Sequence, residues 1–173
     1  HRILDGLQFG SIPIITVLHG AVLGGGLELA SATHIRVAEK SAFYALPEGQ
    51  RGIFVGGGGS VRIPRLIGMA RMMDMMMTGR VYSAEEGMAV GLSQYLVDDG
   101  TGLDKAIELA KKIASNAAAT NYALMHVLPR ITDSNPEQGL MMESLIATIT
   151  KNTPEAKERL KLFLEGKAKK IGE

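Results

Sequence analysis

The 173-residue sequence contains no cysteine and no tryptophan, and aromatic residues make up only 5% of it. Without cysteine the chain can form neither a disulfide framework nor a thiolate metal site, which is consistent with a cytoplasmic protein. The net charge is +1, so the composition indicates no large basic surface for nucleic acid. No apolar run is long enough to cross a membrane, and the first residues do not follow a secretory signal pattern. With 46% hydrophobic and 21% charged residues, the chain has the composition of an ordinary globular protein.

The first ten residues, HRILDGLQFG, begin without methionine and already follow a helical rhythm. Ile3, Leu4 and Leu7 recur on one helical face. This pattern is typical of a helix that starts further upstream. We therefore expect the sequence to be the C-terminal two thirds of a larger chain.

The hydrophobic pattern predicts an α/β half followed by a helical half. A continuous β-branched run at 12–18 predicts a strand buried on both faces, and the alternation at 34–40 predicts a second strand. Another short strand is predicted at 95–97. Further along, the pattern predicts helices at 103–118, 120–130, 136–150 and 154–168. We expect two domains, 1–100 and 101–173.

Helix ends can be predicted from individual residues. Ser83 and Glu86 have the spacing of a capping box. Gly79 is placed to end a methionine-rich helix. Asn135 and Thr153 each precede a proline and are predicted N-caps.

Three consecutive glycines, Gly24 to Gly26, interrupt the stretch HGAVLGGGLELA. They do not form a phosphate-binding loop, which requires lysine where Gly26 stands, nor a dinucleotide-binding fingerprint. Backbone N–H groups at a helix N-terminus, unshielded by side chains, can instead stabilise an oxyanion such as a thioester enolate. The alternative is a tight strand-to-helix turn that binds nothing.

Two glutamates, Glu28 and Glu48, follow these glycines in the sequence. Glu28 stands among apolar residues, and Glu48 follows Pro47 in a turn twenty residues later. Two carboxyl groups brought to one glycine-rich turn form a plausible acid–base pair. Alternatively, Glu28 interacts only with the helix dipole and Glu48 is a solvated turn residue.

Residues 12–68, from IPIITVL to RIPRLIG, resemble the core of the crotonase (enoyl-CoA hydratase/isomerase) superfamily. The stretch TGRVYSAEEGMAVGLSQYLV resembles the next segment of that family, and EAKERLKLFLEGKAKKI resembles its C-terminal helix. The resemblance implies an α/β fold with a crotonase-like spiral of ββα turns and a C-terminal helical trimerisation region. It also implies a homotrimer, or a hexamer of two trimers.

The resemblance further implies an enoyl-CoA hydratase, which adds water across the alpha–beta double bond of an acyl-CoA thioester. Glu48 would deliver a proton to the alpha carbon, Glu28 would assist attack of water at the beta carbon, and Gly25 would supply one oxyanion N–H. The implied substrate-binding residues are Gly24, Gly26, Pro47, Gly56, Phe163 and Lys167. Coenzyme A is then part of the substrate, and no metal or other cofactor is expected.

Two positions depart from the family pattern. Val55 stands where many members have proline, and Ser60 stands where threonine is common, so the acyl preference is expected to differ. The N-terminal third, where the family has its other oxyanion N–H and much of its CoA-binding surface, is expected to lie outside this sequence.

Other readings of the sequence stay open. The same glutamates could serve an isomerase or a dehydratase of an unusual acyl-CoA, or the fold could be a non-catalytic RNA-binding module, which the near-neutral charge argues against. The methionines of 69–77 are expected to pack in the core or around an acyl group. Arg62 and Arg65 are expected to form salt bridges rather than bind phosphate. A basic tail contains Lys167, Lys169 and Lys170.

Overall fold

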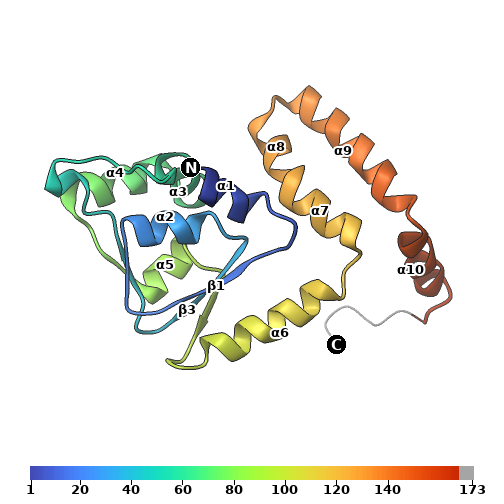
Figure 1. Cartoon of the computed structure of the whole chain (residues 1–173), viewed down its shortest axis with the longest axis horizontal. Coiled ribbons are helices and arrows are strands. Elements are labelled where there is room, and N and C mark those ends of the chain that lie inside the picture. The colour runs from blue at the N-terminus through green and yellow to red at the C-terminus, as the bar shows by residue number, and fades with distance from the viewer. Residues whose placement is uncertain (168–173) are drawn as a thin grey trace. The chain divides into compact units, whose positions relative to one another are not determined.

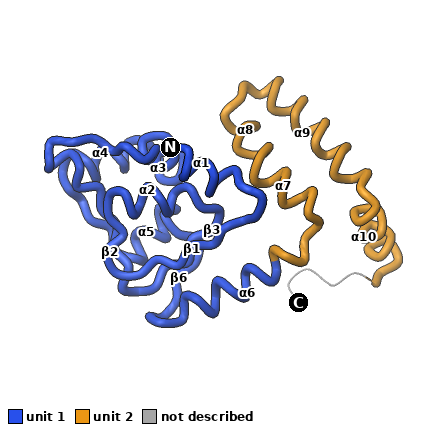
Figure 2. Tube along the Cα trace, viewed as in Figure 1, with its two compact units in different colours: residues 1–112 blue, residues 113–173 orange. Residues whose placement is uncertain are grey.

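The computed structural model describes residues 1–167 (Figure 1). The chain forms two compact units, of which unit 1 comprises residues 1–112 and unit 2 begins at residue 113 (Figure 2). The boundary between the units falls inside helix α6 (Gly102–Ala114). The predicted domain boundary, between residues 100 and 101, lies just before the same helix.

Unit 1 is built from two three-stranded sheets. The first sheet has the order β1-β3-β6 (Ile15–Leu18, Ile35–Glu39, Tyr95–Val97), and both of its strand pairs are parallel. The second has the order β2-β4-β5 (Ala21–Leu23, Phe43–Ala45, Tyr82–Ser83), with β2 parallel to β4 and β4 antiparallel to β5. β1 and β2 enter different sheets, as do β3 and β4, so each of these two strand pairs adds one strand to each sheet, whereas β5 pairs with β4 in the second sheet. The predicted α/β spiral is therefore confirmed.

The strand predicted at 12–18 is shorter and less buried than its sequence suggested. β1 begins at Ile15, and only Leu18 in it is fully buried. Because β1 lies at the edge of its sheet, the β-branched residues before Leu18 are covered on fewer sides. The prediction of burial on both faces was therefore wrong.

Helices and one turn connect the strands of unit 1 (Figure 1). The capping box at the start of α5 is confirmed, because Ser83 Oγ accepts from the Glu86 N–H at 3.2 Å and Glu86 Oε2 accepts from the Ser83 N–H at 2.9 Å. Gly79 ends α4 in the left-handed conformation, as predicted. The elements are α1 (Arg2–Gln8), α2 (Gly25–Ser31), η1 (Gly49–Arg51), α3 (Gly59–Ile67), α4 (Met69–Thr78) and α5 (Ala84–Val90).

The core of unit 1 anchors the short helix α2. Leu27 and Ala30 of α2 are fully buried and belong to one apolar cluster with Ile63 of α3 and Met75 of α4. Burial of a leucine, isoleucine or methionine side chain contributes roughly 1.5–3 kcal/mol relative to exposure. A seven-residue helix is not stable by itself, so this packing holds α2 in place.

A buried arginine fixes the chain that leaves α2. Arg36 is 2% exposed, and it donates from Nη1 to the Thr33 carbonyl at 2.7 Å and from Nε to the Leu92 carbonyl at 2.8 Å. Burial lowers the pKa of Arg36 to about 10, so the side chain stays charged at neutral pH. Its charge is compensated by peptide carbonyls.

Unit 2 is helical. Asn135 and Thr153 cap their helices as predicted, accepting from the N–H groups of Gln138 at 3.0 Å and Ala156 at 3.2 Å. The helix predicted at 120–130 is two helices, because Pro129 lies in the first turn of the second one and cannot continue the first. The helices are α7 (Ala118–His126), α8 (Leu128–Asp133), α9 (Pro136–Lys151) and α10 (Pro154–Leu164).

Within residues 1–167, no helix combines the length and the apolar character needed to cross a bilayer. In the same part of the chain, no three His, Asp or Glu side chains are grouped as metal ligands.

Candidate active site

Glu28 lies on α2 and is 5% exposed. Its Oε1 accepts two backbone hydrogen bonds, from the N–H of Gly57 at 2.7 Å and from the N–H of Gly59 at 2.8 Å. A buried carboxylate requires such charge-assisted bonds, since without them its desolvation is costly. These two donors fix the orientation of the carboxyl group through Oε1, and neither of them bonds to Oε2.

A second run of glycines, Gly56 to Gly59, leads into α3 and is here called the second glycine loop; its conformation is shaped by this carboxylate. A Cβ at Gly59 would lie 2.7 Å from Glu28 Cγ, and a Cβ at Gly57 would lie 3.0 Å from Glu28 Oε2. Glycine at these two positions therefore permits the approach of the Glu28 side chain. From the sequence only Gly56 of this run is a predicted site residue, and the run itself does not indicate that Glu28 is its partner.

Glu48 lies at the start of the turn η1 and is 8% exposed. Its backbone carbonyl accepts from the N–H groups of Arg51 and Ile53, both at 3.0 Å, so the turn is well fixed. Its side-chain atom Oε2 is buried and has no hydrogen-bond partner within residues 1–167. A buried carboxyl oxygen without a partner is costly, which marks this position as a place where a ligand or substrate group can bind.

The Glu48 carboxyl group lies against the first residue of the glycine triplet. Gly24 precedes α2 with φ 49° and ψ −118°, and a Cβ there would collide with Glu48 Oε1. Gly25 and Gly26 are exposed and occupy the first turn of α2, where helix geometry provides no acceptor for the N–H groups. Backbone donors and a carboxyl group thus border the same helix end.

A small pocket of about 160 Å³ gathers part of the predicted site. Four of the predicted site residues line it: Gly24, Gly25, Pro47 and Glu48. Leu23, Arg51 and Ile53 complete the lining and were missed by the sequence analysis. Nothing in their local sequence distinguishes them from ordinary turn and strand residues.

The remaining predicted site residues lie outside this lining. Glu28, Gly26 and Gly56 do not line the pocket, although Glu28 is on the helix that begins there. In unit 2, Phe163 is 65% exposed on α10, and Lys167 Nζ pairs with Glu165 Oε2 at 2.8 Å. Their roles in substrate binding stay predictions. Lys169 and Lys170 lie outside the described residues.

Arg62 connects the second glycine loop to α1. Its side chain is 9% exposed, and it donates to Asp5 Oδ1 and to Gln8 Oε1, both at 2.7 Å. It also donates to the Gly57 carbonyl at 3.3 Å. The predicted salt bridge is confirmed, but Arg62 is buried rather than on the helix surface. Gly57 is thus held at both of its backbone groups: its N–H donates to Glu28, and its carbonyl accepts from Arg62.

This arrangement has the elements of acid–base chemistry next to an oxyanion. The buried Glu28 lies on the short helix α2, and the buried Glu48 carboxyl group, which has an unsatisfied oxygen, lies against the glycine that precedes this helix. Glycine N–H groups lie at the end of the same helix. Such a site could move protons on a substrate whose developing negative charge is held by the backbone.

Comparison with known proteins defines the family. The family model for enoyl-CoA hydratase/isomerase matches residues 2–172. The chain therefore belongs to this family of the crotonase superfamily. It is similar to a structure named "putative enoyl-CoA hydratase" from Rhodopseudomonas palustris, with 60% identity and a TM-score of 0.93, over 96% of this chain and 65% of that one. The crotonase-like fold is thereby confirmed.

Curated relatives extend the comparison. The chain is 37% identical over 165 residues to the "Probable enoyl-CoA hydratase" of Bacillus subtilis, covering 95% of this chain and 64% of that protein. It is 35% identical over 156 residues to the fatty acid oxidation complex subunit alpha of Shewanella loihica, covering 88% of this chain and 22% of that protein. The chain thus spans less than two thirds of either relative.

The two ends of the glycine triplet provide a matched test of the approach of Glu48. Gly24→Ala is expected to lower the free energy of unfolding by about 1–3 kcal/mol, because alanine disfavours the positive φ and its Cβ collides with Glu48. Gly26→Ala is the control, since its Cβ would have no neighbour within 4 Å. Urea unfolding measures both, and equal stability of the two variants would contradict the described approach.

Arg62 and Arg65 lie on the same helix and provide a second matched pair. Arg62→Gln is expected to cost about 1–3 kcal/mol of unfolding free energy, because it removes a buried cation from Asp5 and a donor from the Gly57 carbonyl. Arg65→Gln, at an exposed position, is expected to change stability by about 0.5 kcal/mol or less. Thermal and urea unfolding measure the difference. An Arg62→Gln variant with an unchanged free energy of unfolding would show that the buried contacts contribute little.

Proposed function

We propose that this chain carries the acid–base centre of an enoyl-CoA hydratase, which adds water across the alpha–beta double bond of an acyl-CoA thioester. The observation that carries the proposal is the buried, unpartnered Oε2 of Glu48 in a pocket shared with Gly24 and Gly25. The names of the enoyl-CoA hydratase relatives support the same reaction class.

In the proposed reaction, water is activated by the Glu28 carboxylate. Glu28 accepts a proton as the water oxygen forms a bond to the beta carbon, and the electron pair of the double bond moves toward the thioester oxygen. The Gly25 N–H stabilises the resulting enolate oxygen as a preorganised donor. Glu48, in its protonated form, then delivers a proton to the alpha carbon, and exchange with solvent restores both carboxyl groups.

The hydrogen bonds to Glu28 support this division of roles. Because Oε1 is already engaged by two backbone donors, Oε2 is the oxygen suited to a water molecule. Glu48, by contrast, has an oxygen with no partner in the described chain and lies in the pocket. The reaction exchanges protons and water only, so it requires no oxidant, and coenzyme A belongs to the substrate.

Isomerisation of the double bond is a second candidate. Glu48 lines the pocket and Glu28 does not. A single carboxyl group that removes a proton at one carbon and returns it at another would be sufficient for isomerisation. In that case Glu28 would have a structural role only, through its hydrogen bonds to Gly57 and Gly59.

The two glutamates can be tested by amide substitution in the 173-residue chain. Glu28→Gln and Glu48→Gln are each expected to lower kcat by at least about 100-fold, since each removes a general acid–base group. The assay follows loss of enoyl-thioester absorbance with crotonyl-CoA and longer or aromatic enoyl-CoA substrates. Glu137→Gln, at an exposed position in the first turn of α9, is the control.

The outcome distinguishes the two candidates. Loss of activity in both variants supports hydration by two glutamates. Isomerase turnover, measured with a 3-enoyl-CoA by gain of enoyl-thioester absorbance, that survives Glu28→Gln and is lost in Glu48→Gln supports the second candidate. A chain that binds acyl-CoA and turns over none of these substrates would overturn both.

We further propose that unit 2 assembles the chain into a homotrimer, or a hexamer of two trimers. Its two C-terminal helices expose many apolar side chains, which is unusual for a surface that faces only water. The exposed residues are Leu140, Met141, Leu145 and Ile149 on α9, and Leu160, Leu162, Phe163 and Leu164 on α10.

Light scattering after size exclusion tests the assembly. The 18.5 kDa chain is expected to elute with about three or six times its own mass. Leu145→Lys is expected to reduce this mass toward that of the single chain, because a charge would be buried in the interface. Glu143→Lys, at an exposed position on the opposite side of α9 from Leu145, is the comparison; a monomeric wild type would contradict the proposal.

A further inference from the structure

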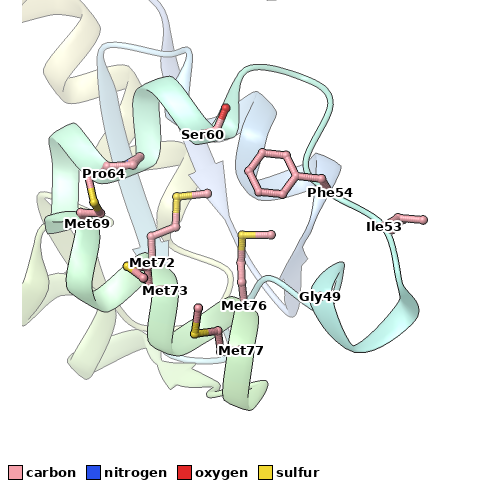
Figure 3. Close-up of a pocket in the computed structure, with 10 residues that line it drawn as sticks. All are labelled: Gly49, Ile53, Phe54, Ser60, Pro64, Met69, Met72, Met73, Met76 and Met77. Carbon is pink, nitrogen blue, oxygen red and sulfur yellow. The ribbon is translucent and has the colours of Figure 1, made fainter.

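A second, larger cavity lies beside the pocket of Glu48. It has a volume of about 580 Å³, within the range of small-molecule sites. Met72, Met73, Met76 and Met77 of α4 form one wall, and Ile53 and Phe54 form part of another. Figure 3 shows the side chains of Met72, Met76 and Phe54 directed from the helix and the loop toward the space between them.

The cavity adjoins the proposed catalytic pocket at one shared residue. Ile53 lines both of them. The N–H of Ile53 donates to the carbonyl of Glu48 at 3.0 Å, and Gly49, which lines the larger cavity, follows Glu48 directly. A ligand whose reacting carbons lie at Glu48 can therefore extend past Ile53 into this apolar cavity.

The lining selects the chemistry of what can bind. None of the lining residues is ionisable, and Ser60 supplies the one polar side chain among them. Burial of a charged or strongly polar group there would lack compensation. An apolar group would gain from leaving water, and unbranched methionine side chains can adapt to groups of different shape.

Exposure of the wall residues indicates the depth of the cavity. Met72 is 5% exposed and packs in the core, whereas Met73 is 46% and Met77 is 74% exposed. Methionines thus extend from the floor to the rim. A four-carbon acyl group, half of it engaged at the reacting carbons, would leave most of this surface in contact with water.

We propose that this cavity binds the distal part of the substrate acyl group, and that Met73 and its neighbours make the site selective for bulky apolar acyl thioesters over short ones. The inference rests on the proposed function, because it takes Glu48 as the reaction centre. The substrate is then a thioester whose acyl group is a chain or ring much larger than crotonyl.

Binding of saturated acyl-CoA compounds tests this inference without catalysis, because they have no double bond to hydrate. Calorimetry on the 173-residue chain compares butyryl-CoA with decanoyl-CoA and 3-phenylpropanoyl-CoA. The two larger compounds are expected to bind at least about tenfold more tightly than butyryl-CoA, because they bury more apolar surface.

Substitutions locate the selectivity. Met73→Trp fills the cavity and is expected to remove the tenfold preference while leaving butyryl-CoA binding within about twofold. Met88→Trp is the matched control, since Met88 is 41% exposed on α5 and does not line the cavity. Met77→Glu, at the rim, is a second variant with little risk to folding, and it is expected to weaken binding of the larger compounds through an unfavourable charge.

The outcomes separate this inference from the proposed function. Equal affinity of the wild type for all three compounds would overturn it, as would a preference that persists in both Met73→Trp and Met77→Glu. Selective binding that these variants abolish, in a chain without hydratase turnover, would support the cavity and contradict the hydratase. Absence of binding to any acyl-CoA would contradict both.

Discussion

The hydrogen bonds between the Glu28 carboxylate and the glycine loop are the interaction on which the site depends. One oxygen of a buried side chain accepts from Gly57 and Gly59, and this joins α2 to the start of α3. A buried carboxylate is tolerated only because these donors replace water. The same loop is held from its other side by Arg62, so α1, α2 and α3 converge on one peptide segment.

The two glycine segments serve one physical purpose in two ways. At Gly57 and Gly59, the absence of a side chain lets Glu28 approach backbone donors. At Gly24, it lets Glu48 lie against the end of α2 and also permits a positive φ. Each glutamate therefore contacts the glycine segment that is farther from it in the sequence. Glu28, which follows Gly24 to Gly26, contacts Gly57 and Gly59, and Glu48 contacts Gly24.

Local features of the sequence predicted local features of the structure. The caps at Ser83, Asn135 and Thr153 and the strand at 95–97 were predictable because each depends on residues a few positions apart. β2 and β5 were missed because strands of three and two residues are too short to show periodicity.

For the candidate site, the sequence identified residues better than it identified their partners. Glu48 and the glycine triplet were expected together, and four of the expected residues line one pocket. The bond of Arg62 to Asp5 spans 57 positions, and no local pattern encodes it. Long-range pairs of this kind arise from how the ββα turns stack, which the hydrophobic pattern specifies only in outline.

The contact of Gly49 with α4 has a mechanical consequence. A Cβ on Gly49 would collide with the Met76 carbonyl, so the turn that carries Glu48 rests directly on the backbone of the methionine helix. A change of methionine side chains that leaves this backbone in place alters only the shape of the cavity. A change that displaces α4 also moves Glu48. The width of the methionine-lined cavity can therefore change without a shift of the Glu48 carboxyl group only while the backbone of α4 stays in place.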